Sequence, residues 1–271
     1  MAALSFTLHA AGVLAPGLSD LAQLRAVSRG EQTWVDAPLE LPGPSQLPSN
    51  ERRRASQVVR LALACIAQVV DGAPWSDIPL RSVFATDEGT GEVSQQMLQA
   101  LSATRQVSPL LFTNSVHNAP SGYFSIAWRN TQPATVVSLG LDSFACGLVC
   151  AVTQAMATAE PVLLVSYDCA MTPPMDEVLG VRQSTATAWI ISTPGSGARA
   201  PALASFTLEL EPAGAHQPSP QPDWLPAAWS GHSSARALAA LGLLDAALGA
   251  AQAMRYGAQM MTLTRATEAT A

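Results

Sequence analysis

The sequence predicts an α/β fold, in which helices flank a mixed β-sheet, and three observations support this. Segments with the two-residue periodicity of strands alternate along the chain with segments that have the apolar spacing of helices. The segment PVLLVSYD at 161–168 is a continuous apolar run, which is typical of a strand buried on both faces of a sheet. The 271 residues also provide enough apolar material for a large core.

The composition indicates a protein whose surface is partly covered by a partner. Hydrophobic residues make up 48% of the chain and charged residues only 13%. So few charges leave apolar patches on the surface, and such patches commonly mark interaction sites. The net charge is −6 and all 14 cationic residues are arginines. An acidic chain with one short basic cluster is a poor nucleic-acid binder, so we expect no nucleic-acid partner.

The cysteines and the N-terminus indicate a cytoplasmic protein. The four cysteines lack the spacing of a disulfide framework, and MAALSFTLHAAGVL lacks the basic region and full apolar core of a signal peptide. No stretch reaches about 18 uninterrupted apolar residues, so we expect no membrane span. We also expect no metal or cofactor. Cys146 and Cys150 are four residues apart on one helix, but no second ligand pair follows them.

The first 70 residues predict a strand and two helices. LSFTLHA at 4–10 alternates like a half-buried strand and is followed by a turn at Gly12 and Pro16. Ser19-Asp20 caps a short helix that stops at Gly30. A proline-rich loop follows, and then one long helix, ERRRASQVVRLALACIAQVV, with Ser49 or Asn50 as its N-cap.

Three consecutive cations begin that long helix, namely Arg52, Arg53 and Arg54. Cations at a helix N-terminus oppose the helix dipole, which favours an acidic partner such as a carrier protein or a phosphate. The alternative is a plain solvated first turn, and the residues alone leave both interpretations open.

The next segment predicts a strand, a turn and a helix. RSVFAT at 81–86 is the strand, and SQQMLQALS is the helix. The turn between them, DEGTG at 87–91, has neither of the glycine patterns that bind phosphate, so we expect a plain turn.

Residues 108–151 predict a connecting loop, a strand, a turn, a second strand at Thr135–Leu139 and a helix that starts near Asp142. A strand that leads through a tight turn into a helix is where many α/β enzymes place a nucleophile, because the helix N-terminus offers unpaired N–H groups to a developing negative charge. Ser143 lacks the flanking glycines of G-x-S-x-G, so an N-terminal capping role is the alternative to a nucleophile.

The C-terminal part predicts a hairpin, a linker and a helix. TATAWIIST and ALASFTLELE are two strands that a Pro/Gly-rich turn would join directly. We therefore divide the chain into a domain at 1–211, a Pro-rich linker at 212–226 and a C-terminal helix with a tail at 227–271. The helix is predicted over SSARALAALGLLDAALGAAQAM, with a frayed end after it.

Two stretches resemble a known family. LSFTLHAAGVLAPG at 4–17 resembles the opening strand and turn of β-ketoacyl synthases, and residues 108–168 align with such synthases without a gap. Matching positions in the second stretch are Ser108-Pro109, Asn118, Gly122, Ile126, Pro133 and Val162–Val165. The resemblance implies a thiolase-like fold, truncated to roughly the N-terminal half.

Two departures from that family imply that the chain does not catalyse condensation. The gapless alignment places Leu141 where the synthases have their nucleophilic cysteine. The two catalytic histidine motifs of the C-terminal half are absent, since His9, His117, His216 and His232 lie in other contexts. Cys146 lies more than a turn inside the helix, where the N–H groups would not lower its thiol pKa.

The chain is most similar to the chain-length-factor subunits that pair with an active synthase, and LPSNERRRASQVVRLALA resembles those of bacterial aryl-polyene pigment clusters. The resemblance implies a heterodimer with a full-length β-ketoacyl synthase that shapes chain elongation on an acyl carrier protein. In it, Thr135–Leu139 would pair with the partner's equivalent strand, and Phe112–Phe124 would reach towards its acyl tunnel. The candidate interface and tunnel residues are Phe112, His117, Asn118, Tyr123, Phe124, Trp128, Thr135, Val136, Val137, Ser138, Leu139 and Phe144.

For each bulky candidate among these, the alternative is an ordinary core aromatic, and for any single one the sequence favours that alternative. Two other functions remain open. One is an acyltransferase or thioesterase that uses Ser143 or Cys146. The other is a scaffold that recruits the carrier protein through Arg52–Arg54.

Overall fold

The computed structural model describes residues 3–72, 74–194, 196, 200–212, 214 and 217–266. These residues form a mixed sheet of eight strands in the order β3-β2-β4-β5-β1-β6-β8-β7, which confirms the predicted fold class. The strands are β1 (Leu4–Leu14), β2 (Arg81–Ala85), β3 (Ala134–Val137), β4 (Val162–Asp168), β5 (Thr185–Ser192), β6 (Ala204–Pro212), β7 (Ala251–Tyr256) and β8 (Gln259–Ala266). The α-helices are α1 (Leu21–Ser28), α2 (Ser49–Arg54), α3 (Gln57–Val70), α4 (Gly91–Thr104), α5 (Pro109–Asn114), α6 (Ala119–Ala127), α7 (Ser143–Thr158), α8 (Met175–Leu179) and α9 (Ser233–Leu241).

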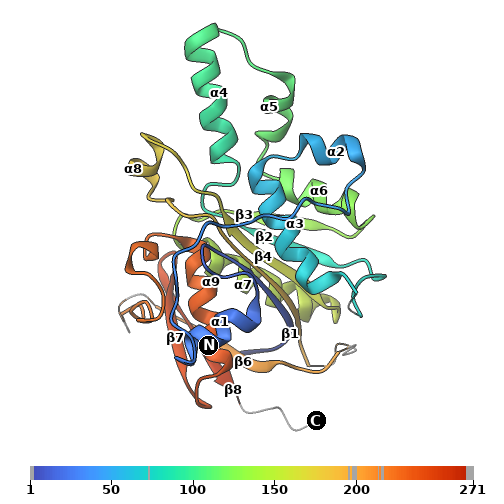
Figure 1. The fold of residues 1–271 in the computed structure, drawn as a ribbon. Coiled ribbons are helices and arrows are strands. Elements are labelled where there is room, and N and C mark those ends of the chain that lie inside the picture. The colour runs from blue at the N-terminus through green and yellow to red at the C-terminus, as the bar shows by residue number, and fades with distance from the viewer. Residues whose placement is uncertain are drawn as a thin grey trace.

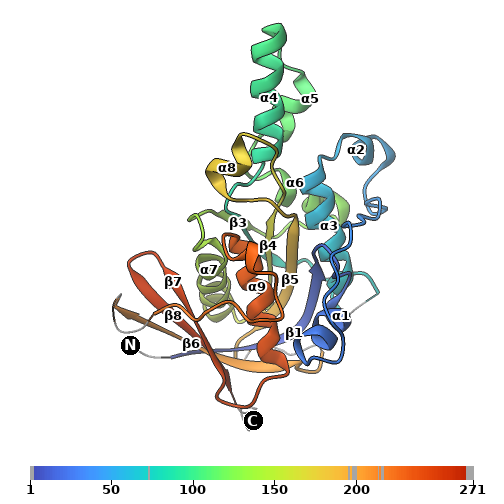
Figure 2. The same cartoon turned by 60° about the vertical axis from the view of Figure 1, so that its left-hand side comes forward.

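Helices cover both faces of the central strands. Successive side chains of a strand point to opposite faces, so in β2 Val83 and Ala85 pack with α7 and α9, whereas Phe84 packs with α3 and α6. Figure 2 shows α7 and α9 on one side of the sheet and α3 on the other. Each face has its own apolar core. Strand β4, between β2 and β5, is buried along its whole length, as its continuous apolar sequence predicted.

The long helix predicted after residue 49 is two helices. Helix α2 ends at Arg54, and Ala55 and Ser56 are extended before α3 begins. The sequence contained a signal for this break, because Ser56 is a favourable N-cap type directly before the apolar face of α3. The three arginines therefore lie in the last turn of α2, where cations agree with the helix dipole. The dipole argument for an acidic partner at Arg52–Arg54 is thus wrong.

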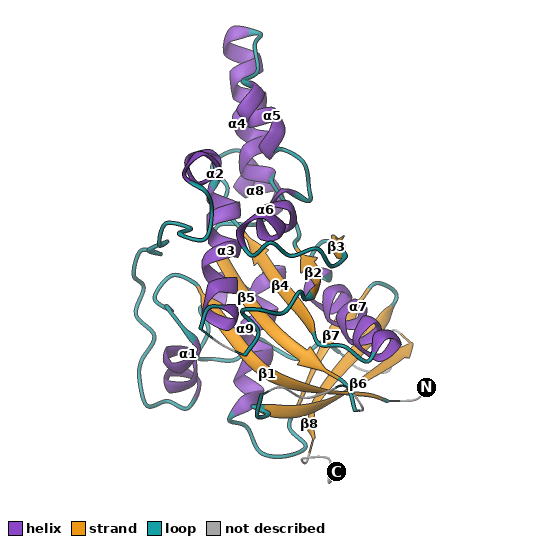
Figure 3. Ribbon diagram, turned by 90° about the vertical axis from the view of Figure 1, so that its right-hand side faces the viewer, coloured by secondary structure: helices purple, strands orange, loops and turns teal. Residues whose placement is uncertain are grey.

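The loop and the strand predicted before β3 are also helical. Residues 108–128 form α5 and α6, each with a proline in its first turn, where proline fits a helix. Helix α4 projects from the body of the protein, and α5 packs beside it (Figure 1). Figure 3 shows the same pair extending beyond the end of the sheet. This pair of helices is called the arm below.

Strands β5 and β6 do not form the predicted hairpin. Strand β1 lies between them and pairs antiparallel with both. The predicted end of β1 near residue 10 is also too early, because the strand continues through Gly12 to Leu14 with an irregularity between Leu8 and Ala10. The long N-terminal strand can therefore serve two neighbours over different parts of its length.

The C-terminal part differs most from the prediction. Helix α9 ends at Leu241 rather than extending to residue 254, and residues 251–266 form the hairpin β7–β8. Gly257 has a positive φ of 58° in the turn of that hairpin, a conformation that favours glycine. Strand β8 pairs with β6, so the hairpin extends the main sheet instead of forming a frayed tail. Residues 267–271 lie outside the described part.

Candidate functional site

The predicted interface strand is an edge of the sheet. Strand β3 pairs in parallel with β2, and no other strand of the described residues pairs with it. Its residues Thr135, Val136 and Val137 are half-buried, and Gln154 of α7 donates a hydrogen bond to the Thr135 hydroxyl at 3.1 Å. An edge strand presents unpaired backbone groups that another strand can use. The strand ends at Val137, so Ser138 and Leu139 belong to the following turn.

That turn presents two leucines where a nucleophile would be expected. Leu139 and Leu141 are 44% and 39% exposed, and Gly140 between them has a φ of 56°. The Ser138 hydroxyl donates to the Asp87 carbonyl at 2.8 Å, which ties the turn to the end of β2. The turn therefore offers an apolar surface beside an open strand edge.

Ser143 stabilises the turn from inside. Its Oγ accepts a hydrogen bond from the Leu139 N–H at 2.8 Å and donates to the Gly140 carbonyl at 2.6 Å, and the residue is fully buried. A hydroxyl held in this way has no access to a substrate. This geometry agrees with a structural role at the start of α7 and not with the alternative of a serine nucleophile.

The N-terminus of α7 is covered by α9. The Phe144 N–H donates to the Ser233 hydroxyl at 2.9 Å, and the Cys146 N–H donates to the Asp142 carbonyl within the helix. Burial raises the pKa of the half-buried Cys146 thiol, and the neighbouring Cys150 adds to this. A raised thiol pKa lowers the thiolate fraction at neutral pH, so Cys146 lacks the activation of a catalytic cysteine.

Asp142 fastens the turn to the C-terminal part of the chain. Its Oδ1 accepts from Arg236 of α9 at 3.0 Å, and its Oδ2 accepts from the Gly257 N–H at 3.1 Å. The Arg255 Nε lies 3.8 Å from Oδ2. Residues from both α9 and the β7–β8 hairpin thus pack on this chain, beside the candidate interface.

The bulky candidate residues divide into core and surface. Phe124 packs against Phe84 and Trp128, with Phe124 and Phe84 buried between helix and sheet. Phe144 is buried against Trp189. Phe124 and Phe144 are therefore core aromatics of this chain and do not reach its surface, as the alternative interpretation held.

The other bulky candidates remain accessible. Phe112 on the arm is 64% exposed. Tyr123 is half-buried, and Trp128 is half-buried with its Nε1 donating to Asp71 at 2.8 Å. His117 and Asn118 are exposed between α5 and α6, and the His117 ring lies so close to Gly89 that a Cβ there would be 2.5 Å from its Cδ2. His117 therefore packs on the turn that follows β2.

The predicted carrier-contact arginines lie on α2, away from the turn before α7. Arg52 donates to the carbonyls of Ser45 and Leu47, Arg53 donates to Asn50, and Arg54 lies 3.6 Å from Glu51. All three side chains are exposed. They remain candidates for contact with an anionic group.

The structure also reveals an acidic cluster around the buried Asp168, with the half-buried Asp87 and Glu88, that sequence reasoning missed. Asp168, at the end of β4, accepts hydrogen bonds from the Thr86 hydroxyl at 2.9 Å and the Asp87 N–H at 2.8 Å. Its other oxygen accepts from the Ser234 N–H at the start of α9. Burial raises the pKa of Asp168 to about 6. The pKa of Glu88 rises to about 7 through burial and the neighbouring Asp87 and Asp168.

The sequence position of Asp168, at the end of a predicted strand, could have indicated this cluster. The carboxyl ends of the parallel strands β2 and β4 meet at one edge of the sheet, and acidic residues follow both strands. The cluster joins three segments that are far apart in sequence. In the described residues, no group of three His, Cys, Asp or Glu side chains is placed to hold a metal ion.

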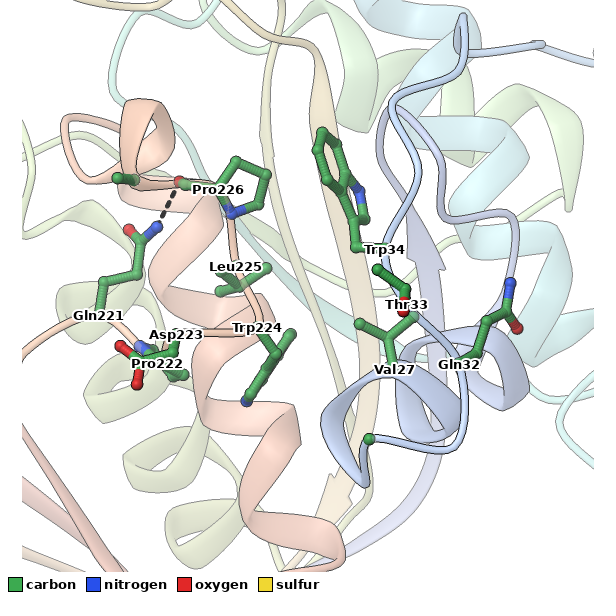
Figure 4. A pocket seen from close by; sticks show the side chains of 12 residues that line it. Val27, Gln32, Thr33, Trp34, Gln221, Pro222, Asp223, Trp224, Leu225 and Pro226 are labelled. Carbon is green, nitrogen blue, oxygen red and sulfur yellow. Dashed lines mark hydrogen bonds between the residues drawn. The ribbon is translucent and has the colours of Figure 1, made fainter.

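Two further features do not involve the predicted residues. The stretch Gly140–Thr158 is long and apolar enough to cross a membrane, but half of it is buried against the sheet, as in the core helix of a soluble protein. A pocket of about 560 Å³ lies between the end of α1 and residues 221–227. Trp34 and Trp224 stand on opposite sides of it (Figure 4). No predicted site residue lines this pocket.

Residues 27–240 match the family model described as "Beta-ketoacyl synthase, N-terminal domain". The chain belongs to this family. The match covers most of the chain, including the edge strand, the turn with Leu141 and most of α9. A search of curated proteins finds no match.

Solved structures of the ketosynthase type superpose on nearly the whole chain. One is a complex of the ketosynthase ApeO with its chain length factor ApeC from Xenorhabdus doucetiae, with 24% identity, a TM-score of 0.72, and coverage of 97% of this chain and 100% of that chain. Another is the ishigamide ketosynthase/chain length factor, with 13% identity, a TM-score of 0.74, and coverage of 96% and 99%. These similarities establish the thiolase-like fold of this ketosynthase family member.

Proposed function

We propose that this chain is a non-catalytic, chain-length-factor-type subunit that pairs with an active β-ketoacyl synthase. The observation that carries the proposal is an apolar turn, with Leu139 and Leu141 exposed, beside the edge of β3 that no strand of the described residues pairs with. An enzyme would need a reactive group at this turn, whereas a binding surface needs apolar area and a free strand edge. The buried Ser143 and the pKa of Cys146, raised by burial, support the same interpretation.

The partner that fits this surface is a full-length synthase of the same fold. Strand β3 would pair with the equivalent strand of the partner, and Leu139 and Leu141 would pack beside that junction. The arm carries Phe112, Leu98 and Leu101 as exposed apolar residues and would contact the partner further from the sheet. The growing chain would be carried by an acyl carrier protein, and both subunits would act in the cytoplasm. The pair would make a product of the aryl-polyene type, which is supported by the resemblance of LPSNERRRASQVVRLALA to proteins of aryl-polyene clusters.

Co-expression with a full-length β-ketoacyl synthase from the same organism tests the pairing. We expect a stable one-to-one complex in size-exclusion chromatography with light scattering. Leu139→Glu combined with Leu141→Glu should weaken the complex at least 100-fold. The leucines are 44% and 39% exposed, so completing their burial contributes only roughly 1–2.5 kcal/mol together, and the larger part of the effect comes from burying two unpaired carboxylates. Leu248→Glu is the matched control, since Leu248 is 61% exposed and precedes β7, at the opposite end of that strand from Gly257, which contacts Asp142.

A well-folded monomer that does not bind the synthase would contradict the pairing. The alternative of an acyltransferase or thioesterase is tested separately by incubation with an acyl thioester and intact mass spectrometry. We expect no covalent adduct. An adduct that disappears in Ser143→Ala or Cys146→Ala would overturn the non-catalytic assignment.

A further inference from the structure

The pocket of about 560 Å³ beside the end of α1 is lined by two segments that are far apart in sequence. One is residues 30–34, and the other is residues 221–227. Figure 4 shows side chains from both segments around it. Its volume is within the range of ligand sites. It contains none of the residues assigned to the contact with a synthase, so it is a separate candidate site.

Two indole rings are held in the wall of this pocket. The Trp34 Nε1 donates to the Pro16 carbonyl at 3.0 Å, and the Trp34 ring packs edge-on against the buried Trp229 with centroids 5.7 Å apart. Trp224 packs so closely on Gly242, which follows α9, that a Cβ there would lie 2.6 Å from the Trp224 Cζ2. Trp34 and Trp224 are nevertheless only half-buried. Each ring therefore has a fixed position and leaves part of its surface open to a ligand.

The segment before α9 is also ordered without a ligand. The φ angles of Pro222 and Pro226 are restricted by their rings. The Leu225 N–H donates to the Pro222 carbonyl at 3.0 Å, and the Gln221 amide donates to the Pro226 carbonyl. A wall that is already ordered loses little conformational entropy when a ligand binds.

Asp223 gives the pocket its charge. It is the only charged residue among the described residues of the lining, and it is exposed. Within the described ranges, no arginine or histidine forms an ion pair with its carboxylate. Arg29, which precedes the loop, pairs with Glu31 at 2.7 Å and lies 3.6 Å from Asp245, so its charge is compensated. The uncompensated carboxylate of Asp223 favours a cationic ligand.

The aromatic wall specifies which cation fits best. A cation over the face of an indole is attracted by the ring, and a guanidinium is found there more often than an ammonium. A guanidinium is planar, stacks on aromatic faces and presents pairs of N–H donors that match a carboxylate. Two indoles beside one carboxylate thus favour arginine over lysine.

The remaining polar groups favour an arginine within a peptide. The side chains of Gln32 and Thr33 make no hydrogen bond in the part of the chain that the structure describes. The amide groups of a peptide backbone can provide their partners. Free arginine instead brings a carboxylate, and the described lining has no cation to pair with it.

We propose that this pocket binds an arginine side chain presented by an extended peptide segment of another protein. The guanidinium stacks on Trp224 and pairs with Asp223. The methylene groups of the arginine pack on Trp34, and the flanking amides of the peptide face Gln32 and Thr33. The binding does not depend on the proposed pairing with a synthase.

Isothermal titration of the full chain compares two probes that differ in one group. The capped tripeptide acetyl-Gly-Arg-Gly-amide has a guanidinium, and its citrulline analogue has a neutral urea of the same shape. We expect the arginine probe to bind about 5- to 20-fold more tightly, because an exposed ion pair contributes up to about 5-fold in affinity and a cation–π contact about 2- to 5-fold. Equal affinity for the two probes, or no saturable binding at millimolar concentrations, would overturn the proposal.

Variants of the lining locate the site. Asp223→Asn should weaken binding of the arginine probe about 3- to 5-fold and leave the citrulline probe unaffected. The matched control is Asp77→Asn, because Asp77 is an exposed carboxylate in the turn before β2, and this variant should leave both affinities unchanged. Trp224→Leu keeps an apolar side chain on Gly242 and should weaken the arginine probe about 2- to 5-fold. Equal effects of Asp223→Asn and Asp77→Asn would contradict a site in this pocket.

Free arginine distinguishes a peptide ligand from a small molecule. We expect it to bind several-fold more weakly than the capped tripeptide, since its carboxylate has no partner in the described lining and lies near Asp223. Tighter binding of free arginine, lost in Asp223→Asn, would overturn the assignment to a peptide. Raising the salt concentration should weaken the arginine probe and not the citrulline probe, because salt screens an exposed ion pair.

Discussion

Arg236→Met tests whether the C-terminal part holds the turn that precedes α7. Arg236 donates from α9 to Asp142 at 3.0 Å, and the exposed side-chain fractions are 22% for Arg236 and 8% for Asp142. The substitution keeps an unbranched apolar chain of similar length and removes only the guanidinium. The Asp142 carboxylate then keeps the Gly257 N–H and the more distant Arg255 as donors.

The expected cost follows from that geometry. A hydrogen bond to a charged group contributes about 1.5–3 kcal/mol, and orphaning a fully buried charge costs about 3–5 kcal/mol. Because Asp142 keeps other donors, we expect about 2–3 kcal/mol. At roughly 2–4 °C per kcal/mol for a chain of this size, the melting temperature should fall by about 4–12 °C.

Thermal unfolding of the wild type, Arg236→Met, Asp142→Asn and the double variant measures the pair in one cycle. The control Arg105→Met should change the free energy of unfolding by less than about 0.5 kcal/mol. Hydrogen exchange at Leu139 and Leu141 should become faster in Arg236→Met, because the turn is released locally. Effects of the two single variants that add within about 0.5 kcal/mol would refute the coupling.

Three further predictions concern packing, pH and reactivity. Gly147→Ala should destabilise the protein by about 1–2 kcal/mol in chemical denaturation, despite alanine's higher helix propensity. The reason is that a Cβ at this position would lie 2.5 Å from the Cβ of Ala85. Unchanged stability would contradict the close approach of α7 to β2. Burial lowers the pKa of His232 to about 4, so between about pH 6.5 and 4 the unfolded chain binds a proton that the folded chain does not. Over that range the stability of the wild type relative to His232→Gln should therefore fall by about 3 kcal/mol. A pH-independent difference would contradict a buried neutral histidine. Cys146 should react with iodoacetamide at pH 7.5 several-fold more slowly than cysteine in a short peptide, because burial raises its thiol pKa. The rate is measured by alkylation followed by peptide mapping, and a faster reaction than that of the peptide would contradict this.

Local patterns predicted the parts of the fold that depend on local chemistry. The unbroken run VLLVSYD predicted the buried β4, and Asp20 caps α1 as expected by accepting from the Gln23 N–H. The Ala/Leu-rich C-terminus was misinterpreted, because composition suited a helix and the tertiary pairing of β8 with β6 decided for a hairpin. The position of β1 between β5 and β6 depends on contacts far apart in sequence, which no local pattern contains.

In the candidate site, too, local patterns predicted some features, and contacts between residues far apart in sequence determined the others. The gapless match to the family placed Leu141 at the turn before α7 and β3 beside it, and the structure has both there. The contact between Asp142 and Arg236 joins residues 94 positions apart, and no local pattern predicts such a pair. The burial of Phe124 and Phe144 also depends on how α6 and α7 pack on the sheet.

The hydrogen bond from the Phe144 N–H to Ser233 limits what a nucleophile placed at this turn could do. Replacing Leu141 by cysteine would return a thiol to the turn, but at least one N–H donor that could stabilise a thiolate or an oxyanion is already occupied by α9. Under the proposed function, the leucine at position 141 is one obstacle to catalysis at this turn, and the occupied N–H donor is a second that comes from a different part of the chain. A single substitution at Leu141 would therefore not build a working nucleophile site at this turn.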